Sequence, residues 1–256
     1  MRFLRRLKRC FWVLVIAAIG MAHYALLRMR GRLSRPERAR WLQKTTRRVL
    51  PYLGVHWQVA GEAPRTGLIV SNHISYVDIL VFSAAIGCSF VSKAEVKDWP
   101  LFGPFAKLSG TVFVWRHSAA DSVRAYSELR ECLKEGHPVV LFPEGTTNDG
   151  EKVLPFRSTM FQAAIDVGAP VIPALISYSI DDGTVREDIA FWGDMEALPH
   201  AMNLFTKRHM ECRIHFGDPL AASDDRKQMA RTAYEWVTER APAVREESFE
   251  KLETRN

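Results

Sequence analysis

Short apolar runs alternate with segments of helical pattern from about residue 55 to residue 240, and few folds accommodate such an alternation. Strands that are joined through helices usually form a parallel sheet covered by those helices. We therefore predict an α/β fold with a mixed, largely parallel sheet flanked by helices. The expected strands are VHWQVAG, GLIVSN, SFVSK, TVFVWR, HPVVLFP, VIPALISYS and CRIHFG, and the expected helices lie near 76–86, 121–135, 156–167, 195–208 and 224–240.

Charge divides the 256 residues into two unlike parts. Residues 1–50 hold 14 lysines and arginines and a single acid, Glu37, and so carry +13, which leaves −7 for the remainder of a chain of net charge +6. A nucleic-acid-binding protein usually carries its basic surface on the folded domain. The acidic body therefore argues against nucleic acid as a partner. We predict a membrane-binding helical segment at 1–50 and an α/β domain at 51–256.

Residues 10–27 form an apolar stretch of 18 residues without formal charge. As a helix this stretch is roughly 27 Å long, slightly less than the hydrocarbon core of a bilayer at about 30 Å. Arginines and lysines flank it on both sides, so the charges give no strong signal for orientation. A helix that enters one leaflet explains this pattern better than a span. The alternative is a secretory signal peptide, which the missing A-x-A site and the downstream arginines disfavour.

A second helix is expected at residues 37–50, where apolar residues recur at a spacing near four and basic residues fill the other face. A basic amphipathic helix beside an apolar one suits an anionic membrane surface. The sequence thus predicts an N-terminal membrane-associated helix pair. The alternative for this second helix is packing on its own domain. The apolar positions are Trp41, Leu42, Thr45, Val49 and Leu53.

The cysteines and histidines indicate neither a disulfide framework nor a metal site. Cys10, Cys88, Cys132 and Cys212 are scattered without a C-x-x-C pair, and the histidines show no pairing at ligand spacing. This cysteine usage fits a reducing compartment. Together with the N-terminal anchor, it predicts a protein associated with the cytoplasmic face of the inner (plasma) membrane, with no bound metal.

The segment SNHISYVDIL, residues 71–80, places a histidine and an aspartate five positions apart between two apolar runs. One interpretation is structural, with Ser75 as the N-cap of a helix and Asp78 completing a capping box. The other is catalytic: His73 leaves a strand end, and Asp78 reaches back to one ring nitrogen so that the other can remove a proton from a hydroxyl. The two roles are compatible, and the spacing alone does not decide between them.

Ligands bind at the carboxyl ends of the strands in sheets of this type, which directs attention to the loops at 71–78, 115–118 and 143–150. In the last of these, Pro143 ends a strand and Gly145 lets the backbone approach a ligand closely. Glu144 and Thr146 offer an acceptor and a hydroxyl. Arg116 and Arg157 also follow strand ends or precede helices. Two arginines near one cleft could hold an anionic head group.

Taken together, NHISYVD, GTVFVWR, FPEGT and VIPALIS resemble the four ordered blocks of the glycerolipid acyltransferases, and most closely the 1-acylglycerol-3-phosphate acyltransferases of the PlsC type. The resemblance covers about residues 55–220. It also includes SKAEVKDWPLFGPFAKLSG, which is similar to the segment between the first two blocks of that family. The resemblance implies that His73 is the general base and Asp78 its orienter. It implies a substrate site formed by Asn72, Arg116, Glu144, Gly145, Thr146 and Arg157.

The reaction implied by this resemblance is direct acyl transfer to a lysophospholipid acceptor. The donor would be an acyl thioester of acyl carrier protein or coenzyme A, acting as co-substrate, with no further cofactor. With the sn-2 hydroxyl of 1-acylglycerol-3-phosphate as acceptor, the product is phosphatidic acid of phospholipid biosynthesis. The absence of G-x-S-x-G agrees with a mechanism that needs no nucleophile from the protein.

One departure from the family pattern bears on the acceptor. Members that act on lysophosphatidate usually have a basic residue after E-G-T, where this chain has Thr147, and F-K-x-G where it has Phe156-Arg157-Ser158. The TTNDG…LPFRS form also resembles relatives that acylate lyso-ornithine lipid or another lysolipid. The sequence interpretation prefers lysophosphatidate and keeps lyso-ornithine lipid as the alternative. A non-catalytic lipid-binding protein on the same fold is a third possibility.

Overall fold

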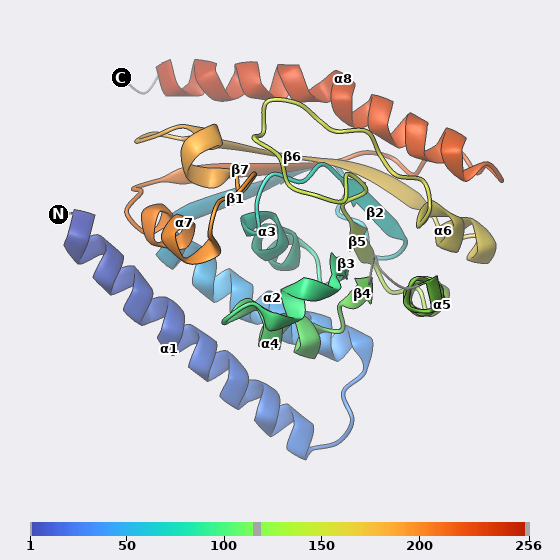
Figure 1. Cartoon of the computed structure of the whole chain (residues 1–256), viewed down its shortest axis with the longest axis horizontal. Helices are drawn as coiled ribbons and strands as arrows, with labels where there is room; N and C mark the ends of the chain where they lie inside the picture. The colour runs from blue at the N-terminus through green and yellow to red at the C-terminus, as the bar shows by residue number, and fades with distance from the viewer. Residues whose placement is uncertain (1, 115–118, 254–256) are drawn as a thin grey trace.

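A seven-stranded mixed sheet forms the centre of the molecule in the computed structural model, which describes residues 2–114 and 119–253 (Figure 1). The strand order is β1-β7-β6-β2-β5-β3-β4. Strands β6, β2, β5, β3 and β4 run parallel, whereas β7 is antiparallel to β6 and pairs in parallel with β1. The predicted strands and the largely parallel sheet are confirmed. The strands are β1 (Val55–Ala60), β2 (Leu68–Ser71), β3 (Ser89–Lys93), β4 (Val112–Val114), β5 (Val139–Leu141), β6 (Val171–Ile180) and β7 (Met210–Phe216).

Helices cover both faces of this sheet, and every predicted helix is present, although most differ in length from the expectation. The helices are α1 (Arg2–Met29), α2 (Arg35–Leu53), α3 (Val77–Ala85), α4 (Phe102–Ser109), α5 (Ala119–Lys134), α6 (Phe161–Val167), α7 (Ala197–Leu204) and α8 (Arg226–Glu253). A 3₁₀ turn at Ala94–Asp98 and a π-helical turn at Val185–Ile189 complete the set. The pattern analysis missed α4 because its first turn contains Gly103 and Pro104, which lower helix propensity. Pro104 is tolerated near the helix start, where its missing N–H has no partner to lose.

The central strands are buried on both faces, as expected for parallel strands between two helical layers. Ile69 and Val140 belong to the core that includes α2 and α3. Their neighbours Leu68, Val70 and Val139 belong to a second core with α5, α6 and α8. The alternation of side chains along each strand therefore explains why these strands read as continuous apolar runs in the sequence.

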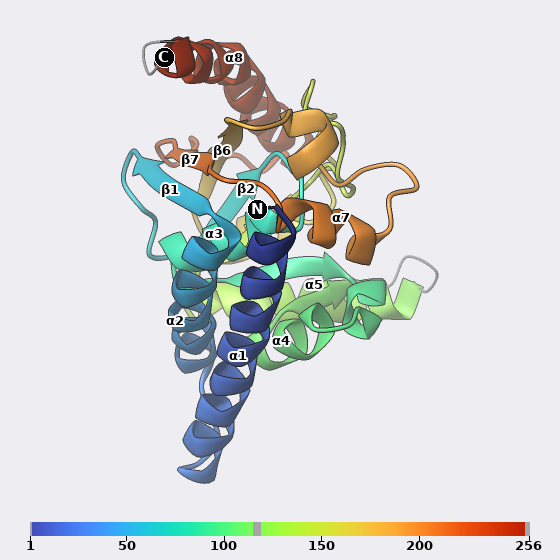
Figure 2. The same ribbon diagram turned by 90° about the vertical axis from the view of Figure 1, so that its left-hand side faces the viewer.

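The apolar face of α2 packs on the domain, which was the alternative that the sequence left open for this helix, so only its basic face is available to a membrane surface. Trp41, Leu42, Leu50 and Leu53 are buried in the same core as α3. The indole N–H of Trp41 donates to the carbonyl of Gly20 at 2.8 Å, which joins α2 to α1. Figures 1 and 2 show α1 and α2 lying side by side along the flank of the sheet. The opposite, basic face of α2 is exposed, with Arg40, Lys44, Arg47 and Arg48. The predicted boundary at residue 50 falls inside the last turn of this helix.

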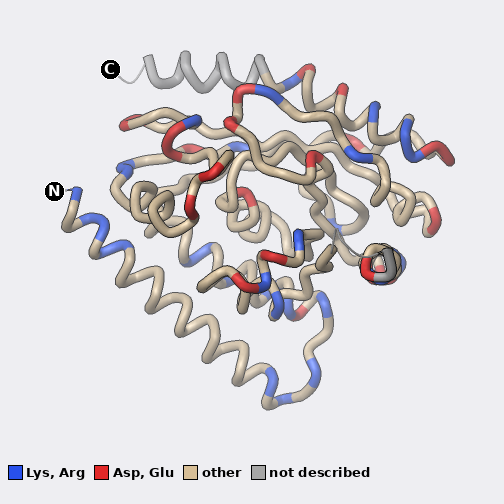
Figure 3. Tube along the Cα trace, in the orientation of Figure 1, with Lys and Arg blue, Asp and Glu red and all other residues tan. Residues whose placement is uncertain are grey.

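Helix α1 has one face on the domain and one apolar face in the open. It is long and apolar enough to cross a membrane by length and composition, and Figure 3 shows its charged residues gathered towards the two ends. Near its start, the buried guanidinium of Arg9 donates to carbonyls after α7, including that of Arg208 at 3.1 Å. The open face exposes large side chains such as Phe11, Leu14 and Leu26. This exposed apolar face indicates that the protein associates with a membrane through α1.

Candidate active site

The side chains of His73 and Asp78 meet where β2 gives way to α3. The Nδ1 atom of His73 lies 2.8 Å from Oδ2 of Asp78. The same carboxylate oxygen accepts the backbone N–H groups of Ile74 at 2.8 Å and Ser75 at 3.0 Å. Asp78 therefore holds both the imidazole and the backbone that leads into α3. The predicted N-cap at Ser75 is wrong, because α3 has Tyr76 as its N-cap and no side-chain cap, but the structural and the orienting roles of Asp78 share one geometry.

Asp78 is completely buried, yet both of its carboxylate oxygens are provided with donors. The hydroxyl of Tyr178 on β6 donates to Oδ1 at 2.6 Å, on the side away from His73. A buried carboxylate is tolerated only when such donors replace its water. The sequence analysis did not single out Tyr178. The signal that could have found it was a tyrosine in a strand that reads as fully buried, because its hydroxyl must find a partner there.

The imidazole of His73 lies at the edge of a cleft of about 570 Å³. Its ring stacks on Phe142 with centroids 4.0 Å apart and planes inclined by 9°. With a carboxylate at Nδ1, that nitrogen carries the proton, and Nε2 keeps a lone pair for a ligand. The side chain of His73 is 16% exposed, which is enough for a ligand in the cleft to reach it.

The cleft is built at the carboxyl ends of the parallel strands, as the topology predicts. His73 follows β2, Lys93 ends β3, Val114 ends β4 and Pro143 follows β5. An apolar wall faces them, and it comes from the start of α3 and from segments that the pattern analysis left without a role. The members of this wall are Tyr76, Ile79, Val96, Trp99, Phe102 and Phe191.

Three of the predicted substrate residues line this cleft: Gly145, Thr146 and Arg157. Gly145 has a φ of 72°, a conformation that glycine adopts without strain and that turns the backbone along the cleft. The N–H of Arg157 donates to the carbonyl of Pro143 at 3.0 Å, which brings the 143–147 and 154–160 segments together. Arg157 and Lys93 thus supply positive charge to the cleft from separate parts of the chain.

Glu144 lies in the same loop, but its carboxylate turns away from the cleft. It is buried, and Oε1 accepts the backbone N–H of His73 at 2.8 Å. The other oxygen accepts the amide of Asn148 at 2.6 Å and the N–H of Leu154 at 3.1 Å. Burial raises the pKa of Glu144 to about 7, and these hydrogen bonds offset only part of that rise. Glu144 therefore holds the backbone of His73 in place, whereas the sequence placed it against the substrate.

Replacing Glu144 with glutamine should remove a pH dependence of folding stability. The pKa of Glu144 is about 7 in the folded protein and about 4.5 in the unfolded chain, so the folded state binds its proton more tightly. Its stabilising contribution is complete below about pH 4.5 and is lost as the pH rises to about 7, with a total change of about 3 kcal/mol. Thermal unfolding of the wild type and of Glu144→Gln between pH 4.5 and 8 measures this difference.

The exposed Glu131 supplies the matched control for this measurement. The unfolding curves of Glu131→Gln should follow those of the wild type at every pH. An unchanged difference between Glu144→Gln and the wild type across the whole range contradicts the assignment of the raised pKa to Glu144.

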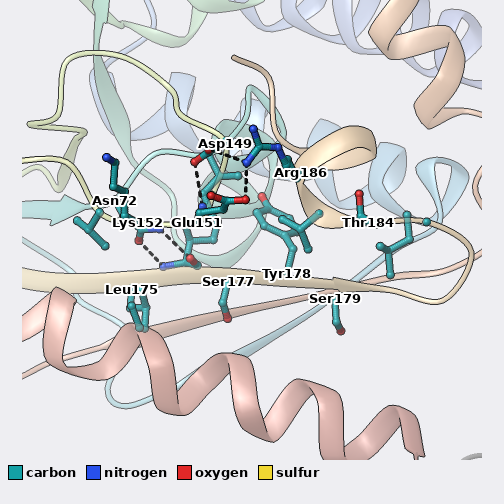
Figure 4. Close-up of a pocket in the computed structure, with 18 residues that line it drawn as sticks. Asn72, Asp149, Glu151, Lys152, Leu175, Ser177, Tyr178, Ser179, Thr184 and Arg186 are labelled. Atoms are coloured by element: carbon teal, nitrogen blue, oxygen red, sulfur yellow. Dashed lines mark hydrogen bonds and ion pairs between the residues drawn. The ribbon is translucent and has the colours of Figure 1, made fainter. Parts of the chain in front are cut away.

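The two remaining predicted residues are not part of the described cleft. Asn72 is buried, and its side-chain amide pairs with both the N–H and the carbonyl of Ile176 at 2.9 Å. It thereby fastens the end of β2 to β6, and it borders a separate cavity of about 390 Å³ (Figure 4). Arg116 lies outside the described residues.

Comparison with known proteins places this geometry in a family. A family model described as Acyltransferase matches residues 56–177. The lyso-ornithine lipid O-acyltransferase of Pseudomonas aeruginosa is 34% identical over 91% of this chain and 92% of its own length. This chain belongs to the PlsC-type acyltransferase family. A relative from Brucella abortus with the same name is 40% identical over 64% of this chain and 67% of its own length.

Other relatives of this acyltransferase carry a different acceptor in their names. The 1-acyl-sn-glycerol-3-phosphate acyltransferase of Neisseria meningitidis is 39% identical over 48% of this chain and 49% of its own length. The crystal structure of PlsC, the 1-acyl-sn-glycerophosphate acyltransferase of Thermotoga maritima, superposes with a TM-score of 0.69. That match covers 96% of this chain and 98% of the other at 22% identity, and it shows that the two proteins share a fold. The family identifies this chain as a lysolipid acyltransferase without fixing its acceptor.

Proposed function

We propose that this acyltransferase moves an acyl chain from a thioester to the hydroxyl of lyso-ornithine lipid, with His73 as the general base. The choice of acceptor rests on the segment after E-G-T, which lacks a basic residue. Thr147 borders the cleft there without a charge, and the amide of the next residue, Asn148, is bonded to Glu144. Similarity to lyso-ornithine lipid O-acyltransferases over nearly the whole chain supports the same choice.

The proposed mechanism is a single direct transfer. Nε2 of His73 takes the proton of the acceptor hydroxyl as its oxygen attacks the thioester carbonyl, and the C–S bond then breaks. The imidazolium returns that proton to the leaving thiolate, so the products are an ester and a thiol. Asp78 stabilises the imidazolium between these two steps and keeps Nδ1 protonated. The apolar wall of the cleft suits the hydrocarbon part of the substrates.

The head groups of lyso-ornithine lipid and lysophosphatidate differ in the number of cationic side chains that they require from the cleft. Its head group carries one carboxylate and one ammonium, whereas lysophosphatidate carries a phosphate monoester of up to two negative charges. A single arginine can bind a carboxylate through two parallel hydrogen bonds, and Arg157 borders the cleft. The second candidate acceptor is 1-acylglycerol-3-phosphate, which the sequence interpretation preferred. The specific observation in its favour is that Lys93 adds a second cation to Arg157.

A panel of acceptors tests the proposal. The full-length protein in lipid vesicles receives acyl carrier protein or coenzyme A thioesters together with lyso-ornithine lipid, 1-acylglycerol-3-phosphate or lysophosphatidylcholine. We expect kcat/KM for lyso-ornithine lipid to exceed that of the others by at least about tenfold, since a mismatched polar head group loses more than about 1.4 kcal/mol of binding. An equal or greater value for 1-acylglycerol-3-phosphate contradicts the proposed acceptor but leaves acyl transfer intact.

The variant Thr147→Arg tests whether the uncharged residue at position 147 determines the choice of acceptor. An added guanidinium in the cleft should raise kcat/KM for 1-acylglycerol-3-phosphate and lower the preference for lyso-ornithine lipid by about tenfold, the value of one charge-assisted hydrogen bond. The control is Thr66→Arg, which adds the same charge at an exposed site away from the cleft. Equal effects of the two variants would show that the position of Thr147 is irrelevant to acceptor choice.

The proposal includes a location. The exposed apolar face of α1 and the exposed basic face of α2 suit a bilayer with anionic lipids, where a lysolipid acceptor resides. Acyl thioesters are made in the cytoplasm, so the active site is proposed to face the cytoplasm at the inner membrane.

A further inference from the structure

Two polar side chains of the sheet lie directly beneath the carboxylate of Asp78. Tyr178 on β6 donates its hydroxyl to Oδ1 at 2.6 Å. Cys212 on β7 is the register partner of Tyr178 in the antiparallel pair, and it is buried beside it. The chain of contacts thus runs from the sheet through Asp78 to the imidazole of His73. The proposed mechanism uses only Asp78 and His73.

We propose that Tyr178 is a positioning residue for acyl transfer, which holds Asp78 so that its Oδ2 faces Nδ1 of His73. The inference rests on the proposed role of His73 as base. The carboxylate has one remaining rotation, about its bond to Cβ. Oδ2 is fixed by His73, Ile74 and Ser75, and Oδ1 accepts from Tyr178. Without that hydroxyl, Oδ1 would be a buried charged atom that has lost its donor, and the carboxylate would gain by turning away.

The hydroxyl of Tyr178 can donate to Asp78 because it stays protonated. Burial and the neighbouring Asp78 raise the pKa of Tyr178 well above its ordinary range. Burial likewise raises the pKa of the Cys212 thiol. Both groups are therefore neutral at physiological pH. Titratable or charged groups surround the His73–Asp78 pair on two sides. On the side of the sheet these groups are Glu144 after β5, Tyr178 on β6 and Cys212 on β7. On the side of the cleft they are Lys93, Tyr76 and Arg157.

Tyr178 is also separated from the substrate cleft. It borders the second cavity, which Figure 4 shows, and it is not among the described residues that line the cleft of His73. A substitution there changes no surface of the described cleft that the acceptor or the donor touches. An effect of Tyr178 on the reaction must therefore pass through Asp78, and it should alter kcat rather than KM.

Tyr178→Phe removes the hydroxyl and keeps the ring. We expect kcat to fall about tenfold, because a hydrogen bond to a charged group contributes at least that factor. The KM values for both substrates should stay within about twofold. Without that donor the carboxylate turns away from Nδ1 and stabilises the imidazolium less, so the acid limb of the pH–rate profile should move to lower pH. The titration of the His73 ring, followed by NMR, should move in the same direction, and this readout needs no acyl acceptor.

The decisive arm repeats Tyr178→Phe in an Asp78→Asn background. If Tyr178 acts through Asp78, the second substitution costs little in kcat once the carboxylate is gone. Tyr234→Phe is the control, since it removes a hydroxyl from a half-buried tyrosine on α8. Assays use the lysolipid that the wild type acylates, well below the unfolding midpoint of each variant. Losses that simply add in the Asp78→Asn background, or an unchanged kcat and His73 titration, overturn the proposal. Failure of the wild type on every lysolipid counts against the proposed function alone.

Discussion

Replacing His73 with alanine should lower kcat for acyl transfer by about 10³-fold or more. The substitution removes the atom that takes the hydroxyl proton, and a positioned base contributes roughly 10² to 10⁴ to such a reaction. The fold should persist, because the ring is stacked on Phe142 at the cleft edge and is not part of the sheet. The measurement is the rate of labelled acyl transfer to the lysolipid in vesicles, with the unfolding midpoint as a check.

His56→Ala is the matched control for this experiment. His56 is an exposed histidine on β1 whose ring contacts His209, far along the sheet from the cleft. Its loss should leave kcat within about twofold, as expected for a surface substitution. If His73→Ala retains wild-type activity while remaining folded, His73 is not the base, and the proposed mechanism is wrong.

Replacing Asp78 with asparagine should lower kcat by about 10³-fold while preserving the architecture of the site. The side-chain oxygen of an asparagine can still accept from Nδ1 of His73 and from the N–H groups of Ile74 and Ser75. Its NH₂ group can donate to the hydroxyl of Tyr178, which is able to accept. The variant therefore removes the negative charge that stabilises the imidazolium, with little change in shape.

The control for Asp78→Asn is Asp194→Asn, which neutralises an exposed carboxylate outside the cleft. Only the variant at position 78 should lose activity, and its KM for the thioester should remain close to that of the wild type. A loss of activity that is fully explained by unfolding, with normal kcat in the folded fraction, would assign Asp78 to a structural role alone.

Helix α2 shows that an amphipathic pattern cannot distinguish a membrane surface from a protein core. A stripe of Trp41, Leu42 and Leu53 opposite a row of arginines predicts an amphipathic helix equally well at a membrane and on a protein core. The helix itself is confirmed, but its apolar face is buried against the domain. The exposed apolar surface belongs instead to α1, which the sequence identified from the length of its uncharged stretch.

Glu144 and Asn72 illustrate a second limit. Both stand in family blocks beside residues of the cleft, so the sequence assigned them to the substrate. In the fold, each carries out hydrogen bonding that keeps the strand ends together: Glu144 with the N–H of His73, and Asn72 with Ile176. A residue adjacent to a site residue along an extended or turning backbone points in a different direction, and sequence proximity does not report that direction.

The linear sequence by itself determined the alternation of strands and helices, the apolar anchor and the pairing of His73 with Asp78. Each of these depends on residues within a few positions of one another, whose spacing follows from the geometry of helix and strand. Only the tertiary structure decided that Tyr178, 100 residues beyond Asp78, completes the carboxylate, and that Lys93 and Arg157 share one cleft. Those contacts depend on the order and register of strands in the sheet, because strand pairing joins segments that the chain itself keeps far apart.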